Sequence, residues 1–233
     1  MPRHGLSREP SPSAAWRRWA LAPGLLLATV AVLSAATPNA RWENEIRAFE
    51  ASDRTNPPPP QANLFVGSSS IRLWKTLPAD FPARPVINRG FGGSEIADST
   101  AFADRIIVPY HPRLVVLYAG DNDIAAGNSP ERVLADYRAF VRKIETELPN
   151  ARIAFIAIKP SLARWKLVDN IRNANARVEE FAATDRRQVF IDVFTPMLGP
   201  DGRPRPELFA PDGLHLNHKG YAIWATRIRP LLR

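Results

Sequence analysis

Apolar residues along the chain gather in short runs that alternate with longer amphipathic stretches. Five of these runs are continuous rather than alternating, a pattern typical of strands buried on both faces of a sheet. Each run is followed by glycine or by a proline-containing loop, which are common ends of strands. The five predicted strands cover residues 64–66, 86–88, 114–118, 153–158 and 189–193.

The stretches around the predicted strands carry apolar residues at helical spacing. They predict helices over residues 95–108, 130–148 and 161–184, and a last helix over residues 219–229. The alternation of strands and helices predicts an α/β domain, in which a parallel five-stranded sheet is covered by helices on both faces.

The first 36 residues have the pattern of a segment that directs export. Arg17 and Arg18 precede an apolar run over residues 19–36, which ends in the small residues Ser34 and Ala36. This order is typical of a secretory signal peptide and predicts a protein of the periplasm or the extracellular space. The run also approaches the length of a membrane-spanning helix, so an uncleaved membrane anchor is the alternative.

Residues 37–60 form a short section before the main domain, which is predicted over residues 61–233. Apolar residues within 42–49 have helical spacing, and the four prolines at 57–60 make a stiff connector after them. The main domain has the length of a single folding unit. Apolar residues make up 45% of the chain and charged residues 23%, which excludes disordered and fibrous classes.

Cysteine count and charge exclude further classes of function. The chain has no cysteine, which excludes disulfide scaffolds, thiolate zinc sites and cysteine nucleophiles. Its net charge of +8 comes from basic residues that are scattered along the chain. Binding of nucleic acid requires clustered Lys and Arg with interleaved aromatic residues, so no nucleic-acid partner is predicted.

Residues suited to catalysis follow the predicted strands. A serine cluster (residues 68–70) follows the first strand, a glycine-rich segment (90–93) the second, and Gly-Asp-Asn-Asp (120–123) the third, while Asp212 and His215 precede the last helix. Ligands of parallel sheets bind beyond the carboxyl ends of the strands, so these segments are predicted to share one rim. There a serine can attack a substrate, an imidazole oriented by a carboxylate can take its proton, and N–H groups can hold an oxyanion.

Other motifs with similar residues fit less well. The α/β-hydrolase elbow requires glycine where Ile71 stands, and no Gly-Lys-Ser/Thr follows the first strand as a phosphate loop would need. A zinc site is one alternative, because its preferred donors occur in the series Asp212, His215 and His218. His218 is also a rival to His215 as the base. A metal would leave the serines and the glycine-rich segment without a role, so neither a metal nor a cofactor is predicted.

The four segments resemble, in order and in position, the sequence blocks of the SGNH/GDSL hydrolase family. The resemblance covers residues 63–221, and its first two blocks are Phe-Val-Gly-Ser-Ser at 65–69 and Asn-Arg-Gly-Phe-Gly-Gly at 88–93. The other two blocks are Gly-x-Asn-Asp at 120–123 and Asp-x-x-His at 212–215. The resemblance implies a flavodoxin-like three-layer α/β/α sandwich.

The resemblance also implies roles for individual residues. It makes Ser69 the nucleophile, His215 the base and Asp212 the group that orients the base. It further implies an oxyanion hole formed by the N–H groups of Ser69 and Gly93 and by the side chain of Asn122.

One position departs from the family pattern. The family usually has Asp between the glycine and the nucleophile, where this chain has Ser68. Serine is uncharged and replaces that aspartate only partly as an acceptor in the turn. Since Ser68, Ser69 and Ser70 are adjacent, the register of the resemblance is what selects Ser69.

Two tryptophans follow predicted strands near the same rim. Trp74 lies five residues after Ser69, and Trp165 follows the fourth strand. Either side chain could line a substrate pocket for an acyl group or a sugar. The alternative for both is a place at the edge of the core, which is common for tryptophan.

Together these features predict an exported serine esterase that acts on small-molecule or glycan esters. No long apolar insertion is present that would form a lid, which favours short acyl groups. An envelope O-acyltransferase with the same residues, which passes the acyl group to a sugar hydroxyl, is one alternative. A non-catalytic carbohydrate-binding protein on the same fold is another. Contact with a membrane is predicted only through an uncleaved N-terminal segment, and the sequence carries no signal of oligomeric state.

Overall fold

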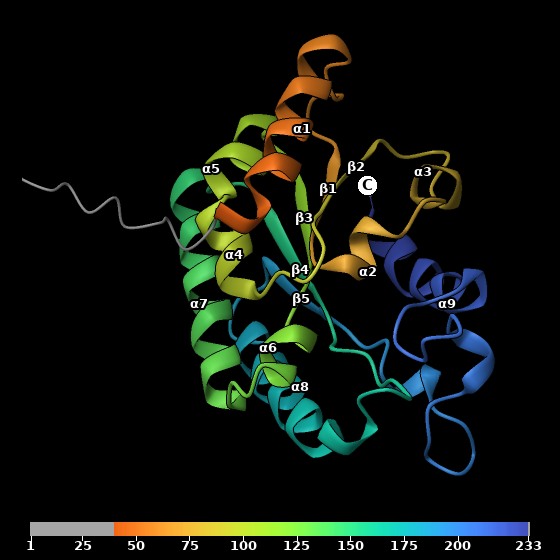
Figure 1. Ribbon diagram of the computed structural model, residues 1–233. Coiled ribbons are helices and arrows are strands. Elements are labelled where there is room, and N and C mark those ends of the chain that lie inside the picture. Colours follow the sequence, from red (N-terminus) through yellow and green to blue (C-terminus); the bar gives the residue numbers. More distant parts are fainter. Residues whose placement is uncertain (1–39, 233) are drawn as a thin grey trace, which may run out of the picture. The chain divides into compact units, whose positions relative to one another are not determined.

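A five-stranded parallel sheet forms the centre of the protein (Figure 1). The computed structural model describes residues 40–232. The strands are β1 (Asn63–Gly67), β2 (Val86–Gly90), β3 (Leu114–Tyr118), β4 (Arg152–Ile156) and β5 (Gln188–Ile191), in the spatial order β2-β1-β3-β4-β5. Each neighbouring pair is parallel. The predicted parallel sheet is therefore confirmed, and its strand order is the flavodoxin-like one.

Helices bury both faces of this sheet, as the continuous apolar runs require. In β1, Leu64 and Val66 belong to one core and Phe65 to the other. The first core includes residues of α1 (Glu43–Thr55), α4 (Ile96–Ala101), α5 (Ala103–Ile106), α6 (Asp121–Ala125), α7 (Pro130–Glu147) and α8 (Val168–Ala182). The second includes residues of α2 (Ser69–Arg72), α3 (Leu77–Asp80) and α9 (His218–Ile228). The predicted three-layer sandwich is confirmed.

Short 3₁₀ helices complete the described part of the chain. They are η1 (Ala40–Trp42), η2 (Val108–Tyr110), η3 (Trp165–Leu167), η4 (Thr195–Met197), η5 (Pro206–Leu208) and η6 (Arg229–Leu231). Among residues 40–232, no helix is long and apolar enough to cross a membrane. The predicted signal peptide or anchor lies outside the described residues.

The helix predicted over residues 95–108 is divided at Phe102. The backbone of Phe102 (φ −93°, ψ 2°) leaves the α-helix between α4 and α5. Its buried ring packs edge-on against Phe91, with 5.9 Å between the ring centroids. The division thus accompanies a core contact that the helical pattern alone does not reveal.

The helix predicted over residues 161–184 begins too early, since α8 starts only at Val168. The preceding loop is held by a tertiary contact, because Ala163 donates its N–H to the carbonyl oxygen of Gly213 at 3.1 Å. Arg164 of the same loop reaches α6 with its side chain. Contacts with distant parts of the chain therefore outweigh the helical pattern here.

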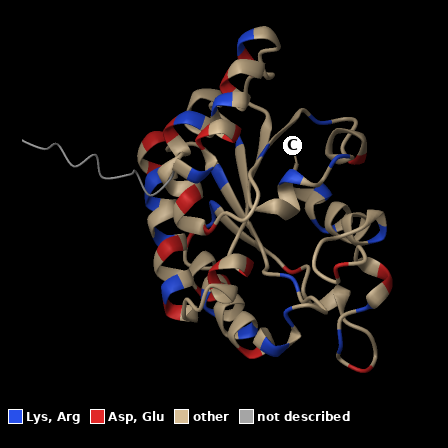
Figure 2. Cartoon of the chain, in the orientation of Figure 1, with Lys and Arg blue, Asp and Glu red and all other residues tan. Residues whose placement is uncertain are grey.

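The helix predicted within residues 37–60 is α1, which packs onto the sandwich. Residues 40–232 all belong to one compact unit. Arg105 of α5 pairs with Glu43 at 2.8 Å and with Glu50 at 2.7 Å, and Arg89 of β2 pairs with Asp53 at 2.5 Å. Figure 2 shows charges of both signs interspersed along α1 and the neighbouring helices. These pairs join α1 to the sheet and to α5.

Candidate active site

The carboxyl ends of β1, β2 and β3 lie side by side. Gly67 at the end of β1 is level with Gly90 of β2 and with Tyr118 of β3. Gly67 has a φ of +124°, and a Cβ added to it would lie 2.0 Å from the carbonyl oxygen of Tyr118. Only glycine fits this close approach. The next residue, Ser68, then donates its N–H to the same carbonyl oxygen at 2.9 Å.

The turn after β1 presents one serine of the cluster to the rim. Ser68 and Ser70 are buried, with 2% of each exposed, whereas Ser69 is half-buried. The Oγ atom of Ser69 lies 2.9 Å from Nε2 of His215. Of the three adjacent serines, Ser69 is the one whose side chain meets the histidine.

The loop before α9 carries the histidine and its carboxylate partner. Nδ1 of His215 lies 2.6 Å from Oδ2 of Asp212. The other carboxylate oxygen, Oδ1, accepts the backbone N–H groups of Leu214 and His215, each at 2.9 Å. The two-residue gap between Asp212 and His215 thus closes a turn in which one side chain binds both the ring and the loop backbone.

The partners of Asp212 favour an ionised carboxylate, which orients the imidazole. Burial raises the pKa of Asp212, but the hydrogen bonds from the His215 ring and the two backbone N–H groups outweigh it and lower the pKa to about 2. An ionised carboxylate at Nδ1 favours the tautomer with its proton on that nitrogen. The Nε2 lone pair then faces Ser69 and can accept the hydroxyl proton.

The glycine-rich segment lies next to α2, which carries Ser69, and contacts residues on both sides. The indole Nε1 of Trp42 donates to the carbonyl oxygen of Gly92 at 2.8 Å. Gly93 has a φ of +77°, and a Cβ there would lie 2.7 Å from the Arg41 guanidinium. Ser94 accepts a hydrogen bond at its carbonyl oxygen from Nδ2 of Asn122, at 2.9 Å. The second and third segments are therefore directly connected.

The side-chain amide of Asn122 has partners at both ends. Nδ2 donates to Ser94 as just described, and Oδ1 accepts from Nη2 of Arg164 at 3.1 Å. An amide nitrogen has two N–H groups, so Asn122 keeps a second donor. Asn122 lies in the first turn of α6, which follows Gly120 with its φ of +105°. Asn122 can thus serve as a donor to an oxyanion while held in one orientation.

Three charged residues behind Asn122 were not predicted from the sequence as site residues. Asp121 accepts from Lys159 Nζ at 2.8 Å and from Arg164 Nη1 at 2.6 Å. Lys159 is 1% exposed and Asp121 is 5% exposed. Burial raises the pKa of Asp121, but the two cations outweigh it and hold that pKa below its usual value. A lysine at the end of an apolar run, before Pro160, is the sequence signal that could have indicated this cluster.

The two tryptophans lie in different places. Trp74 is 1% exposed, stacks on Tyr221 with 5.0 Å between ring centroids, and donates from Nε1 to Asp80 at 2.6 Å. It is thus a core residue, the alternative that the sequence left open, and the structure does not bring it to the rim. Trp165 is half-buried, with the guanidinium of Arg203 5.5 Å from its ring centroid.

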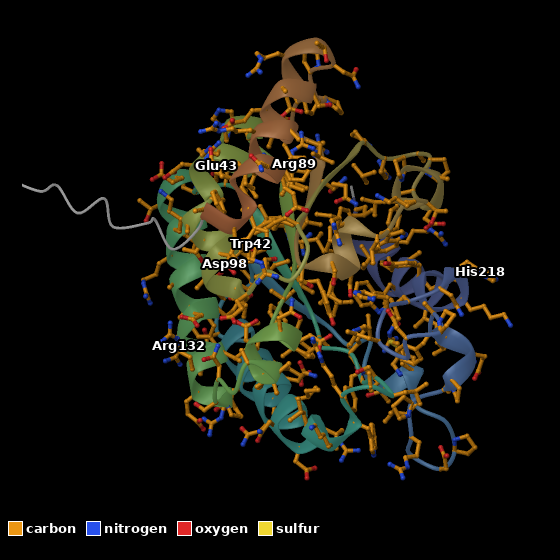
Figure 3. The ribbon with its side chains drawn as sticks, viewed as in Figure 1. Trp42, Glu43, Arg89, Asp98, Arg132 and His218 are labelled. Carbon is orange, nitrogen blue, oxygen red and sulfur yellow. The ribbon has the colours of Figure 1, made fainter. Side chains whose placement is uncertain are left out.

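His218, the rival base, does not join the site. It is exposed at the first position of α9, away from the sheet (Figure 3). No group of three or more His, Asp and Glu residues that could hold a metal ion occurs within residues 40–232. A cavity of about 500 Å³ lies elsewhere, at the amino ends of the strands, where Asn63, Leu114 and Arg152 line it. The triad geometry, rather than cavity size, locates the candidate site.

The chain is similar in sequence to known proteins. The profile of the GDSL-like lipase/acylhydrolase family matches residues 64–223. The chain is 26% identical over 208 residues to the platelet-activating factor acetylhydrolase IB subunit alpha1 of Bos taurus, covering 82% of each chain.

Solved structures give the same fold. A GDSL-like lipase from Bacteroides thetaiotaomicron has a TM-score of 0.69 at 20% identity, covering 80% of this chain and 96% of that one. A lipase/acylhydrolase from Enterococcus faecalis has a TM-score of 0.60 at 20% identity, covering 73% and 97%.

Proposed function

The chain belongs to the GDSL-like lipase/acylhydrolase family, and on this basis we propose that it is an exported serine esterase that hydrolyses short-acyl carboxylic esters. The observation that carries the proposal is the unbroken line of hydrogen bonds from Ser69 through His215 to Asp212. Nucleophile, base and orienting carboxylate in this arrangement suit acyl transfer through a covalent intermediate.

In the proposed reaction, Oγ of Ser69 attacks the carbonyl carbon of the ester while Nε2 of His215 takes the hydroxyl proton. The negative charge on the carbonyl oxygen is held by the N–H groups of Ser69 and Gly93 and by Nδ2 of Asn122. The bond to the alcohol then breaks, and the alcohol leaves with the proton from His215. Water attacks the acyl-enzyme in the same way, which releases the carboxylic acid and restores Ser69.

Two observations support a short acyl group. Among residues 40–232, Leu162 is the only exposed large hydrophobic side chain, at 42% exposure, so little apolar surface is offered to a long acyl chain. The Bos taurus relative is, by its name, an acetylhydrolase. Export is proposed from the basic and apolar pattern of residues 1–36.

Hydrolysis of p-nitrophenyl esters with acyl chains from two to sixteen carbons tests the proposal. The purified protein should release nitrophenol fastest from the shortest esters. The Ser69→Ala variant should lower the rate by more than about 10³-fold, since it removes the attacking atom.

The neighbouring serines provide matched controls. Ser68→Ala and Ser70→Ala remove buried hydroxyls that do not contact His215, and both variants should keep most of the activity. A folded wild-type protein without ester hydrolysis would argue against the esterase. Equal loss in all three serine variants would argue against Ser69 as the nucleophile.

A further inference from the structure

A charged cluster lies directly behind the side chain of Asn122. The carboxylate of Asp121 is held between Lys159 at 2.8 Å and Arg164 at 2.6 Å, one cation on each oxygen. Lys159 and Asp121 are buried, and the side chain of Arg164 is 21% exposed. Two cations and one carboxylate leave one uncompensated positive charge beside the amide. Groups that are this well buried and paired hold a fixed geometry.

Arg164 connects this cluster to Asn122. One end of its guanidinium, Nη1, is fixed on Asp121, and the other, Nη2, donates to Oδ1 of Asn122 at 3.1 Å. The planar guanidinium presents donors in a rigid fork, so the ion pair on one side determines where the other donor lies. The oxygen of the Asn122 amide is therefore kept on the side of Arg164.

The opposite orientation of the amide is excluded by its partners. A flipped Asn122 would place its NH₂ group against the donors of Arg164 and its oxygen against the carbonyl oxygen of Ser94. Both contacts would be repulsive. In the observed orientation the amide nitrogen faces Ser94 and retains its second N–H.

The position of Arg164 is itself set by the catalytic loop. Its neighbour Ala163 donates its N–H to the carbonyl oxygen of Gly213 at 3.1 Å. Gly213 lies between Asp212 and His215, and Leu162 packs against it. The loop before η3 thus contacts the base loop on one side and the amide of Asn122 on the other.

We propose that Arg164 is a positioning residue of the esterase, which fixes the Asn122 amide as an oxyanion donor. This inference rests on the proposed function. The guanidinium acts in two ways through Asn122: it blocks rotation of the amide, and as a cation on Oδ1 it makes the N–H groups stronger donors. Lys159 keeps Asp121 paired and so supports Arg164 from behind.

Two substitutions of Arg164 separate its geometry from its charge. Arg164→Met keeps similar bulk but removes both hydrogen bonds, while Asp121 stays paired with Lys159. We expect kcat/KM for p-nitrophenyl acetate to fall by about 10- to 100-fold, less than for loss of the donor itself. Arg164→Lys keeps the charge, but a single ammonium cannot reach both Asp121 and Asn122. It should retain the wild-type melting temperature and still be slow.

A double-mutant cycle with Asn122→Ala shows whether Arg164 acts through Asn122. In the Asn122→Ala background, Arg164→Met should cost less than about 3-fold, because the group it positions is already absent. An equal loss in both backgrounds would overturn the proposal and indicate a general structural role. Wild-type activity in Arg164→Met or in Arg164→Lys would overturn it as well.

Arg177 provides a matched control on α8. It too bridges an amide oxygen and a carboxylate, donating to Asn173 at 2.6 Å and pairing with Glu131 at 2.5 Å. These contacts lie outside the candidate site, so Arg177→Met should keep kcat/KM. A wild-type protein without Ser69-dependent hydrolysis would refute the proposed function. An active wild type whose Arg164→Met variant is equally fast would refute this inference alone.

Discussion

The two oxygens of Asp212 have different partners, and this difference makes Asp212→Asn a sensitive test of the proposed triad. Oδ1 accepts the N–H groups of Leu214 and His215, and Oδ2 faces Nδ1 of His215 at 2.6 Å. An asparagine can satisfy the two backbone donors only with its oxygen. Its NH₂ group must then face the imidazole.

The amide forces the wrong tautomer on the ring. A donor at Nδ1 favours the form of His215 with its lone pair on Nδ1 and its proton on Nε2. Nε2 then points an N–H at Ser69 and cannot take the hydroxyl proton. A reversal of this kind costs about 10⁴-fold in turnover. The loop keeps its two backbone hydrogen bonds, so the melting temperature should stay close to that of the wild type.

Asp212→Ala gives the contrasting result. It removes the orienting group without imposing the wrong tautomer, and it leaves the N–H groups of Leu214 and His215 without an acceptor. We therefore expect Asp212→Ala to be less stable than Asp212→Asn, and Asp212→Asn to be no more active than Asp212→Ala. Rates with p-nitrophenyl acetate and thermal unfolding monitored by circular dichroism measure both quantities.

Asp201 offers a control for the substitution itself. Its Oδ1 accepts the N–H of Arg203 at 3.0 Å in an exposed turn outside the site, so Asp201→Asn should leave the rate unchanged. A fully folded Asp212→Asn protein within about tenfold of the wild-type rate would refute the reasoning, because an imposed tautomer should cost far more.

Three further predictions concern other parts of the structure. Gly93→Ala should lower kcat by about 10²–10³-fold by displacing an oxyanion donor. Its control is Gly127→Ala, at a φ of +95° with open space around it, where backbone strain should lower the melting temperature and leave kcat unchanged. Trp74→Ala should cost about 3–5 kcal/mol of unfolding free energy in denaturant titrations, without a change in acyl-chain preference. Burial raises the pKa of Asp123 to about 7, above the 3.8 of the unfolded chain, so the folded protein binds this proton more tightly. The unfolding free energy should therefore fall by up to about 4 kcal/mol as the pH rises from about 4 to above 7, and Asp123→Asn should remove this part of the slope.

The strands and the segments that follow them could be predicted because the signal is local. Continuous apolar runs identified all five strands, and parallel strands end at one edge. The meeting of Ser69 with His215, far apart in the chain, follows from that edge and from the resemblance to a known family. The place of Trp74 could not be predicted from its short sequence distance to Ser69. Trp74 lies two residues after the end of α2, and its ring belongs to the second core instead of the rim.

Residues 161–167 show that a local sequence pattern does not encode contacts with distant parts of the chain. Their sequence favours an α-helix. A backbone hydrogen bond from Ala163 to Gly213 and the side-chain contacts of Arg164 with α6 hold the chain in a loop before η3 instead. Each of these partners is distant in sequence. Lys159 could have been noticed as a cation in an apolar run, but its partner Asp121 is defined only by the packing of β4 beside β3.

The replacement of the usual aspartate by Ser68 does not weaken the case for Ser69, because position 68 acts through its main chain. Its N–H donates to Tyr118 at 2.9 Å, and its carbonyl oxygen accepts from Ile71 at 2.9 Å and Arg72 at 3.2 Å. The side chain makes no capping hydrogen bond to α2 and is buried. A small uncharged residue meets these requirements without placing an ionised group in a buried position. The departure therefore changes the charge beside the nucleophile and leaves the backbone that positions Ser69 intact.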